Sequence, residues 1–204
     1  MPGSLPGLRT AFTVTDCIET ITGGRSTWRF RPHYHVGDEI VTLLAGRARL
    51  RLPTGCRDVG AGETVVVPAG TVHRFEPVDT EGWAFTSRFV LRDDTTRRPS
   101  NPLVARTIEL LAQRDSLRSG TEELASACRV SAGHLTRAFR RVTGTSPHNF
   151  HVLLVLQKAK ALLRDGAPLA ATAFDSGFYD QAHLTREFVR TYGFTPKAYR
   201  SAWM

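Results

Sequence analysis

Four residues in the first half of the chain have the types and the spacing of metal ligands. His33 and His35 are two residues apart, Glu39 follows four residues later, and His73 comes from a separate stretch. Residues i and i+2 of a β-strand share a face, so the first two imidazoles can reach one ion. Three nitrogens and one carboxylate suit Zn, Fe, Mn, Ni or Co, with positions open for water or a ligand. The spacing predicts a divalent metal site; the alternative is that the histidines are donors lining a pocket, or satisfied interior residues.

Glycine, proline and aromatic residues surround this candidate site. The two stretches read His-x-His-x3-Glu-x6-Gly and Gly-x5-Pro-x-Gly-x2-His, and the glycines and the proline favour turns that aim the strands. Aromatic side chains on the same stretches can line a cavity for a small-molecule effector, although strand aromatics are more often plain core. The candidate effector-pocket residues are Trp28, Phe30, Phe75, Trp83 and Phe85.

Two arginine-rich segments of the second half have the chemistry of DNA readers. Arginine can bind guanine and glutamine can bind adenine, so Arg137, Gln181 and Arg186 are the candidates for base contacts. The other arginines lie about a turn further along and suit phosphate contacts. We expect His134 and His183 to contact the DNA backbone. The full candidate set is Gly133, His134, Thr136, Arg137, Arg140, Arg141, Gln181, Ala182, His183, Arg186 and Arg190.

The charge distribution favours a polyanionic partner for the second half. The chain of 204 residues has a formal net charge of +8, of which the first 100 residues contribute +2 and the rest +6. Each phosphate that a basic residue contacts releases counterions, so a basic half suits nucleic acid. No apolar run approaches the roughly 20 residues that span a bilayer. We also expect no secretory signal, no disulfide framework from three scattered cysteines, and a cytoplasmic, nucleoid-associated protein.

The pattern of elements divides the chain in two. Residues 1–91 alternate apolar and polar positions, as in 47–52, and are punctuated by Gly and Pro, which is typical of a sandwich or barrel. Residues 92–102 are polar with two prolines and predict a linker. From 103 to 204 the apolar spacing is helical. We therefore predict a β domain, a linker and an all-α domain with these boundaries.

The helical half contains an internal repeat with a period of 49 residues. His134, Phe139 and Gly144 recur as His183, Phe188 and Gly193. Each copy predicts a short helix, a tight turn and a longer helix, over 121–127 and 131–143 and again over 168–175 and 180–192. This is helix-turn-helix geometry, in which the second helix enters the major groove. A long helix over about 147–164 connects the copies.

These segments resemble the DNA-binding domain of the AraC/XylS family of bacterial transcriptional regulators. The similarity covers about 103–203 and includes Ser131-Ala-Gly-His-Leu-Thr-Arg-Ala-Phe-Arg-Arg and the terminal Gly193-Phe-Thr-Pro. It implies that one chain reads two successive major-groove faces, with the connecting helix holding the readers about 34 Å apart. The two His-containing stretches resemble the motifs of the cupin superfamily over about 26–90. The resemblances imply a two-domain α+β chain: an N-terminal cupin-like β-barrel and a C-terminal double helix-turn-helix.

Together these features predict an effector-responsive, sequence-specific transcriptional regulator that is not an enzyme and has no catalytic residues. The expected partners are double-stranded DNA, a small-molecule effector and RNA polymerase, without a membrane, and the chain is expected to be a monomer or a homodimer. We expect coupling between the halves to pass through the linker. Two alternatives stay open: a metal-dependent cupin enzyme of dioxygenase or isomerase type with a DNA-targeting module, and a nonspecific nucleoid binder.

Overall fold

The N-terminal half is an antiparallel sheet that folds over on itself. The computed structural model describes residues 11–15, 18–25, 31–80, 82–90, 100–114, 116–117 and 120–204. The strand order is β1-β2-β7-β3-β4, and β5 and β6 also pair with β3. The strands in the described residues are β1 (Ala11–Thr15), β2 (Ile18–Arg25), β3 (Asp38–Leu52), β4 (Gly55–Gly60), β5 (Thr64–Val67), β6 (Arg74–Pro77) and β7 (Trp83–Val90).

The long strand β3 folds the sheet. Its first part pairs with β5 and β7, and its last part pairs with β4 and β6. The register shifts just before Gly46, whose φ of 71° is left-handed. A Cβ at Gly46 would lie 2.0 Å from the carbonyl oxygen of Gly82, so only glycine fits this crossing. Buried side chains from both parts of β3 then share one hydrophobic cluster, which closes the barrel.

The arginine row of β3 lies on the outer face of this barrel. Arg49 binds the carboxylate of Asp58 on β4 through two hydrogen bonds of 2.6 and 3.0 Å, and Arg51 pairs with Glu76 on β6. Ala48 and Leu50 point the other way and are buried. The alternation therefore places charge in solvent and apolar side chains in the core, as period two requires.

The C-terminal half is helical from Pro102 onward. The helices in the described part of the chain are α1 (Pro102–Ala112), α2 (Thr121–Ala127), α3 (Ala132–Thr143), α4 (Pro147–Arg164), α5 (Leu169–Ser176), α6 (Gln181–Tyr192) and α7 (Pro196–Trp203). None of them is both long and apolar enough to cross a bilayer. The helix α1 begins inside the predicted linker, because Asn101 caps it by accepting a hydrogen bond from the N–H of Val104 at 3.1 Å. Residues 92–99 of that linker lie outside the described residues.

The predicted helix boundaries are close to those observed. Ser131, Pro168 and Asp180, the predicted first residues of three helices, are N-cap positions, and these helices begin one residue later. Thr121, the predicted first residue of the first short helix, is also the first residue of α2, and Gly120 occupies the cap position.

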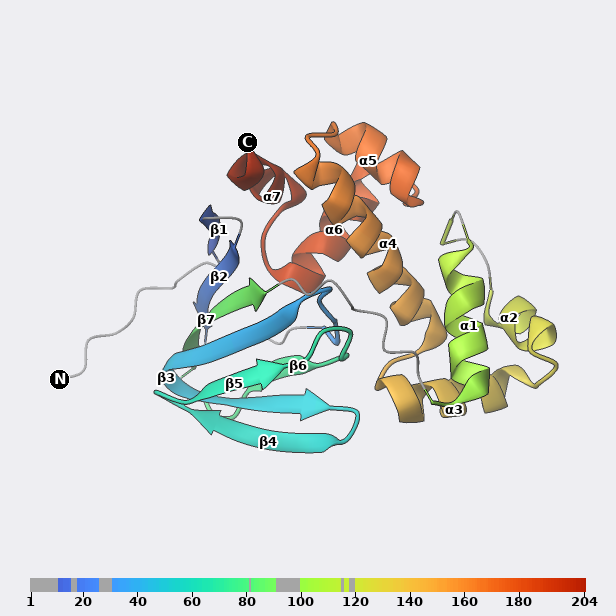
Figure 1. The fold of residues 1–204 in the computed structure, drawn as a ribbon, viewed down its shortest axis with the longest axis horizontal. Coiled ribbons are helices and arrows are strands. Elements are labelled where there is room, and N and C mark those ends of the chain that lie inside the picture. Colours follow the sequence, from blue (N-terminus) through green and yellow to red (C-terminus); the bar gives the residue numbers. More distant parts are fainter. Residues whose placement is uncertain are drawn as a thin grey trace.

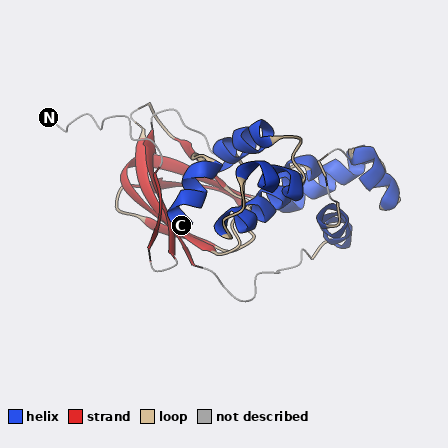
Figure 2. Cartoon of the chain, turned by 90° about the horizontal axis from the view of Figure 1, so that it is seen from above, coloured by secondary structure: helices blue, strands red, loops and turns tan. Residues whose placement is uncertain are grey.

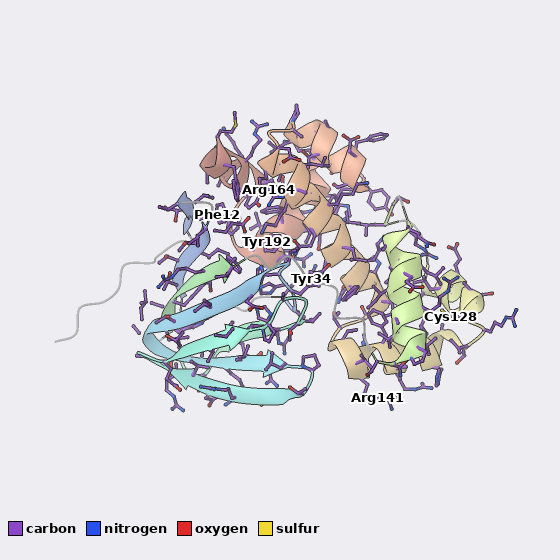
Figure 3. All side chains as sticks on the ribbon, in the orientation of Figure 1. Phe12, Tyr34, Cys128, Arg141, Arg164 and Tyr192 are labelled. Atoms are coloured by element: carbon purple, nitrogen blue, oxygen red, sulfur yellow. The ribbon has the colours of Figure 1, made fainter. Side chains whose placement is uncertain are left out.

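The barrel and the helices pack against each other directly. Strands gather at one end of the molecule and helices at the other, with α7 beside the sheet (Figures 1 and 2). One hydrophobic cluster continues from barrel residues such as Val41 and Phe89 into Leu156 and Tyr199 of the helices. Figure 3 places Tyr34 and Tyr192 where the two halves meet. The halves therefore share a core.

Candidate metal centre and nucleic-acid interface

Backbone pairing brings His33 and His73 face to face. Each N–H donates to the other residue's carbonyl oxygen at 2.8 Å, which forms an isolated bridge at the end of the barrel next to the helices. Their Nδ1 atoms lie 2.7 Å from the carbonyl of Arg31 and 2.9 Å from that of Thr71. A carbonyl can only accept, so both Nδ1 atoms carry the proton. In the neutral rings the Nε2 atoms are then unprotonated and available as ligands.

His35 and Glu39 complete a compact group with these two histidines. Oε2 of Glu39 lies 2.6 Å from Nε2 of His73 and 3.5 Å from Nε2 of His35. One ligand atom from each of the four residues lies within 4.8 Å of the others, and all four residues are buried. The structure thus brings together the whole predicted set, from two stretches about 35 residues apart in the sequence.

The donor set fits a divalent metal ion. Within the described residues, both ring nitrogens of His35, Nε2 of His73 and Oε2 of Glu39 have no well-directed hydrogen bond although they are buried. Buried polar atoms without partners are costly, and an ion coordinated by the group would satisfy one nitrogen of His35 together with Nε2 of His73 and Oε2 of Glu39.

Burial keeps two of the imidazoles neutral. It lowers the pKa of His33 to about 4, with a further decrease from the charge of His73, and it lowers the pKa of His35 well below 6.5. Burial alone would raise the pKa of Glu39, but the charges of His35 and His73 hold it below its usual range. Neutral imidazoles beside a carboxylate are the protonation states that a metal requires.

A small cavity opens beside the cluster. Its internal volume is about 10 Å³, which is room for about one water molecule. Two predicted effector-pocket residues, Phe75 and Phe85, line it, and Trp83 stacks on Phe85 at 4.7 Å as core. Trp28 and Phe30 lie outside the described residues. The lining also includes residues that sequence reasoning missed: Ile21, Ser87 and Tyr192.

The two predicted reader helices, α3 and α6, repeat the same local architecture. Ser131 caps α3 by accepting a hydrogen bond from the third helical N–H at 3.2 Å, and Asp180 caps α6 in the same way at 2.6 Å. Each helix ends at a left-handed glycine, Gly144 or Gly193. Side-chain caps followed by proline then start α4 and α7. The 49-residue repeat is therefore structural as well as sequential.

Both readers present their candidate residues to solvent. Leu135 and Phe139 of α3, and Leu184 and Phe188 of α6, are fully buried on the opposite face. In the described part of the chain none of the exposed arginines of α3, nor Arg186 of α6, makes an ion pair. Arg190 lies 3.4 Å from Glu187. The exposed candidates are Gly133, His134, Arg137, Arg140, Arg141, Gln181, Ala182, Arg186 and Arg190, with Thr136 and His183 half-buried.

His183 differs from its counterpart in the first copy. Its ring packs against Phe178 and Tyr179, with centroids 5.2 and 5.3 Å apart, whereas His134 is exposed. The exposed ring of His134 is therefore accessible for the expected contact with the DNA backbone, whereas the ring of His183 is held by its two aromatic neighbours.

Comparison with known proteins assigns the two halves. The profile of the helix-turn-helix domain matches residues 124–202, and that of the cupin domain matches 18–85. A putative AraC-like transcription regulator of Streptomyces antibioticus is 35% identical over 103 residues, which are 50% of this chain and 34% of that protein. The chain joins a cupin domain to a helix-turn-helix domain, and it is similar over half its length to a protein named as AraC-like. The predicted resemblance and fold class are thereby confirmed.

Two solved structures have a partial likeness to the chain. The C-terminal domain of AraT, a response regulator from Geobacillus stearothermophilus, is 23% identical, with a TM-score of 0.49 over 53% of this chain and 90% of that one. A transcriptional regulator with an AraC-type DNA-binding domain from Chromobacterium violaceum is 22% identical, with a TM-score of 0.46 over 49% and 90%. The chain spans about a third of the length of the curated regulator that it matches.

Proposed function

We propose that this protein is a transcriptional regulator that binds DNA sequence-specifically and responds to the occupancy of its cupin site. The observation that carries the proposal is the pair of reader helices, α3 and α6. Both are capped alike, both expose basic side chains, and α4 connects them. Reader helices in this arrangement place their first turns at base edges in successive major grooves. The similarity to a protein named as an AraC-like transcription regulator supports the same function.

The cupin domain is the sensor in this proposal. His33, His35, Glu39 and His73 hold a divalent transition metal, whose chemical contribution is to coordinate a ligand at its open positions. A small-molecule effector changes the population of domain arrangements only if it binds one of them better. The protein acts in the cytoplasm on double-stranded DNA and communicates with RNA polymerase, as a monomer or a homodimer.

The decisive experiment isolates duplexes that the protein selects from a random library and measures affinity for one of them. We expect Arg137→Ala and Arg186→Ala each to weaken the selected duplex by about 1–3 kcal/mol and to leave binding to an unrelated duplex nearly unchanged. Arg57→Ala removes an exposed barrel arginine that pairs with Glu63 and serves as the matched control. Equal losses on both duplexes would contradict base reading, and failure to select any sequence would indicate a nonspecific binder.

A metal-dependent cupin enzyme is the second candidate, and the buried set of three imidazoles and one carboxylate favours it. Besides the ligands, the cavity wall offers only Ser87 and Tyr192 as polar groups in the described residues. Turnover of candidate substrates with added Fe(II), abolished by Glu39→Gln, would establish this function instead.

A further inference from the structure

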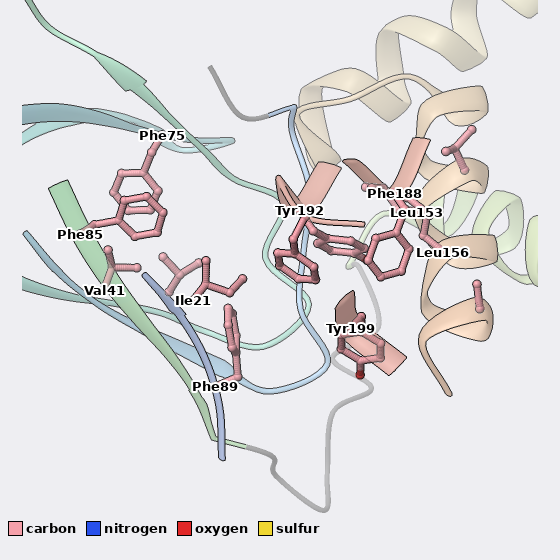
Figure 4. Packing of buried hydrophobic residues seen from close by; sticks show 14 of the residues in the cluster. Ile21, Val41, Phe75, Phe85, Phe89, Leu153, Leu156, Phe188, Tyr192 and Tyr199 are labelled. Atoms are coloured by element: carbon pink, nitrogen blue, oxygen red, sulfur yellow. The ribbon is translucent and has the colours of Figure 1, made fainter. Parts of the chain in front are cut away.

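The last residue of the second reader helix forms a wall of the cupin site. Tyr192 ends α6 and is fully buried, and its ring centroid lies 6.4 Å from that of His33 and 6.2 Å from that of His35. Figure 4 shows the ring between Ile21 of the barrel and Phe188 of its own helix. Of the residues that line the cavity, Tyr192 is the one from the helical domain. The second reader therefore closes the metal site.

Polar contacts hold this closure in place. Lys160 of α4 lies 2.7 Å from Oε2 of Glu19 on β2, and the hydroxyl of Tyr199 donates to Oε1 of the same carboxylate at 2.6 Å. Arg31 pairs with Glu187 of α6. These residues belong to different halves of the chain, so together they form one interface, which we name the docking face.

Gln157 joins Tyr192 to the docking face. Its amide donates to the carbonyl oxygen of Tyr34 at 2.9 Å and lies 3.3 Å from the Tyr192 hydroxyl. Lys160 lies 5.4 Å from the centre of the Tyr192 ring, within the range of a cation–π contact. Movement of Tyr192 therefore disturbs the contacts that dock α4 and α6 on the barrel.

The size of the cavity limits what can occupy the docked arrangement. A volume of about 10 Å³ admits a water molecule or an ion, but no organic ligand. The barrel walls, Ile21, Phe75 and Phe85, come from paired strands and are fixed core residues. An organic ligand that coordinates the ion can therefore enter only by taking the place of Tyr192.

We propose that docking of α6 and binding of an organic ligand at the cupin site exclude each other, so that ligand binding undocks the second reader helix. The vacated space lies among His35, Phe188 and the ammonium group of Lys160, which favours a small aromatic ligand with one donor atom for the ion. The proposal rests on the proposed function. It assigns the response to the effector, and with it the coupling between the two halves, to the docking face instead of to the linker at 92–102.

Lysine labelling and ligand affinity test the exclusion on the full chain. Lys160 is nearly buried in the docking face, whereas Lys158 on the same helix is exposed and serves as an internal reference. The probe is 4-phenylimidazole, added to protein loaded with Co²⁺, whose visible spectrum reports coordination. We expect acylation of Lys160, but not of Lys158, to accelerate about tenfold or more when the probe coordinates the cobalt.

Two variants separate docking from the site itself. Arg31→Ala loosens the docking face and Tyr192→Ala opens the cavity, while Arg57→Ala is the matched surface control. Only undocked protein binds the probe, so the apparent affinity falls in proportion to the undocked fraction. We therefore expect Arg31→Ala and Tyr192→Ala to bind the probe about tenfold more tightly than the parent and the control. Equal affinities in all four proteins, or coordination without faster Lys160 labelling, would overturn the exclusion.

The metal and the DNA results can be distinguished. If none of the four proteins takes up cobalt, the proposal fails, while selection of a DNA sequence would leave the reader function standing. If the probe excludes docking but no duplex is selected, the proposed function fails and the exclusion survives.

Discussion

At the scale of single residues, the cluster in the cupin domain shows how backbone position controls side-chain chemistry. His33 and His73 are not merely close; the carbonyl oxygens of Arg31 and Thr71 fix which of their nitrogens can act as ligand. Substitution of one candidate ligand leaves three, so it should lower metal affinity more than it lowers the stability of the fold.

We therefore expect His35→Ala and His73→Ala to lower metal affinity by at least about 100-fold, a loss beyond that of outer-shell changes. Metal content measured by mass spectrometry after purification, and competition with a chelator, report the change. His148→Ala removes an exposed histidine at the start of α4 and should keep the metal. Metal retained in both ligand variants would show that the cluster is not the site.

A buried histidine outside the cupin cluster, His151, should make stability depend on pH. Burial, and then the charges of Arg114 and His148, lower the pKa of His151 to about 4 from 6.5. The unfolded chain therefore binds more protons between these values, so the free energy of unfolding falls as pH decreases from 6.5 to 4.

His151→Leu should flatten this pH dependence relative to the parent by up to about 3 kcal/mol at pH 4, as measured by urea unfolding of the metal-free proteins. Comparison of the two proteins isolates His151, because His33 and His35 contribute alike to both. Parallel stability profiles would contradict a depressed pKa at this position.

At the scale of elements, the fold of β3 at Gly46 sets the shape of the barrel. The strand must bring its first part to β7 and its last part to β4, and the crossing leaves no space for a side chain. Gly62 also has a left-handed φ, of 83°, but nothing lies within 4 Å of the position of its Cβ.

Gly46→Ala should therefore destabilise the protein by about 3 kcal/mol or more, because it adds a clash with Gly82 to the cost of the backbone conformation. Gly62→Ala should cost only about 1 kcal/mol, the conformational part alone. Thermal and urea unfolding of the two variants measure both values. Equal costs would show that β3 shifts to accept a methyl group.

Elements of the helical domain were predictable because their signals are local. Ser131, Asp180 and Ser146 cap their helices through hydrogen bonds to residues three positions away, and these patterns are readable in a sequence. The spacing of His33, His35 and Glu39 is also local, and the glycine-proline pattern supplied His73. The His/Glu cluster and the cavity residues Phe75 and Phe85 were therefore predictable, whereas Ile21, Ser87 and Tyr192 were not, since these walls come from strands and a helix far apart in sequence.

At the scale of the whole molecule, the docking face is what the sequence did not predict. Glu19 pairs with Lys160, which lies about 140 positions away in the chain. An ion pair between residues so far apart produces no periodic pattern in the sequence. One signal did exist in the repeat: Tyr192 and Glu187 stand where the first copy has Thr143 and Ala138. The second reader helix thus has an aromatic and an acidic residue that the first lacks, and these two contact the barrel at the cavity and at Arg31.

The shared core also bears on how the two halves can be recombined. The cluster that runs from Phe89 through Tyr192 and Tyr199 belongs to both domains. A chimera that joined this helical domain to a foreign N-terminal domain would expose those rings to solvent and remove the Glu19 carboxylate that pairs with Lys160. Exchange of either domain for a foreign one would therefore require matching surfaces as well as a compatible linker.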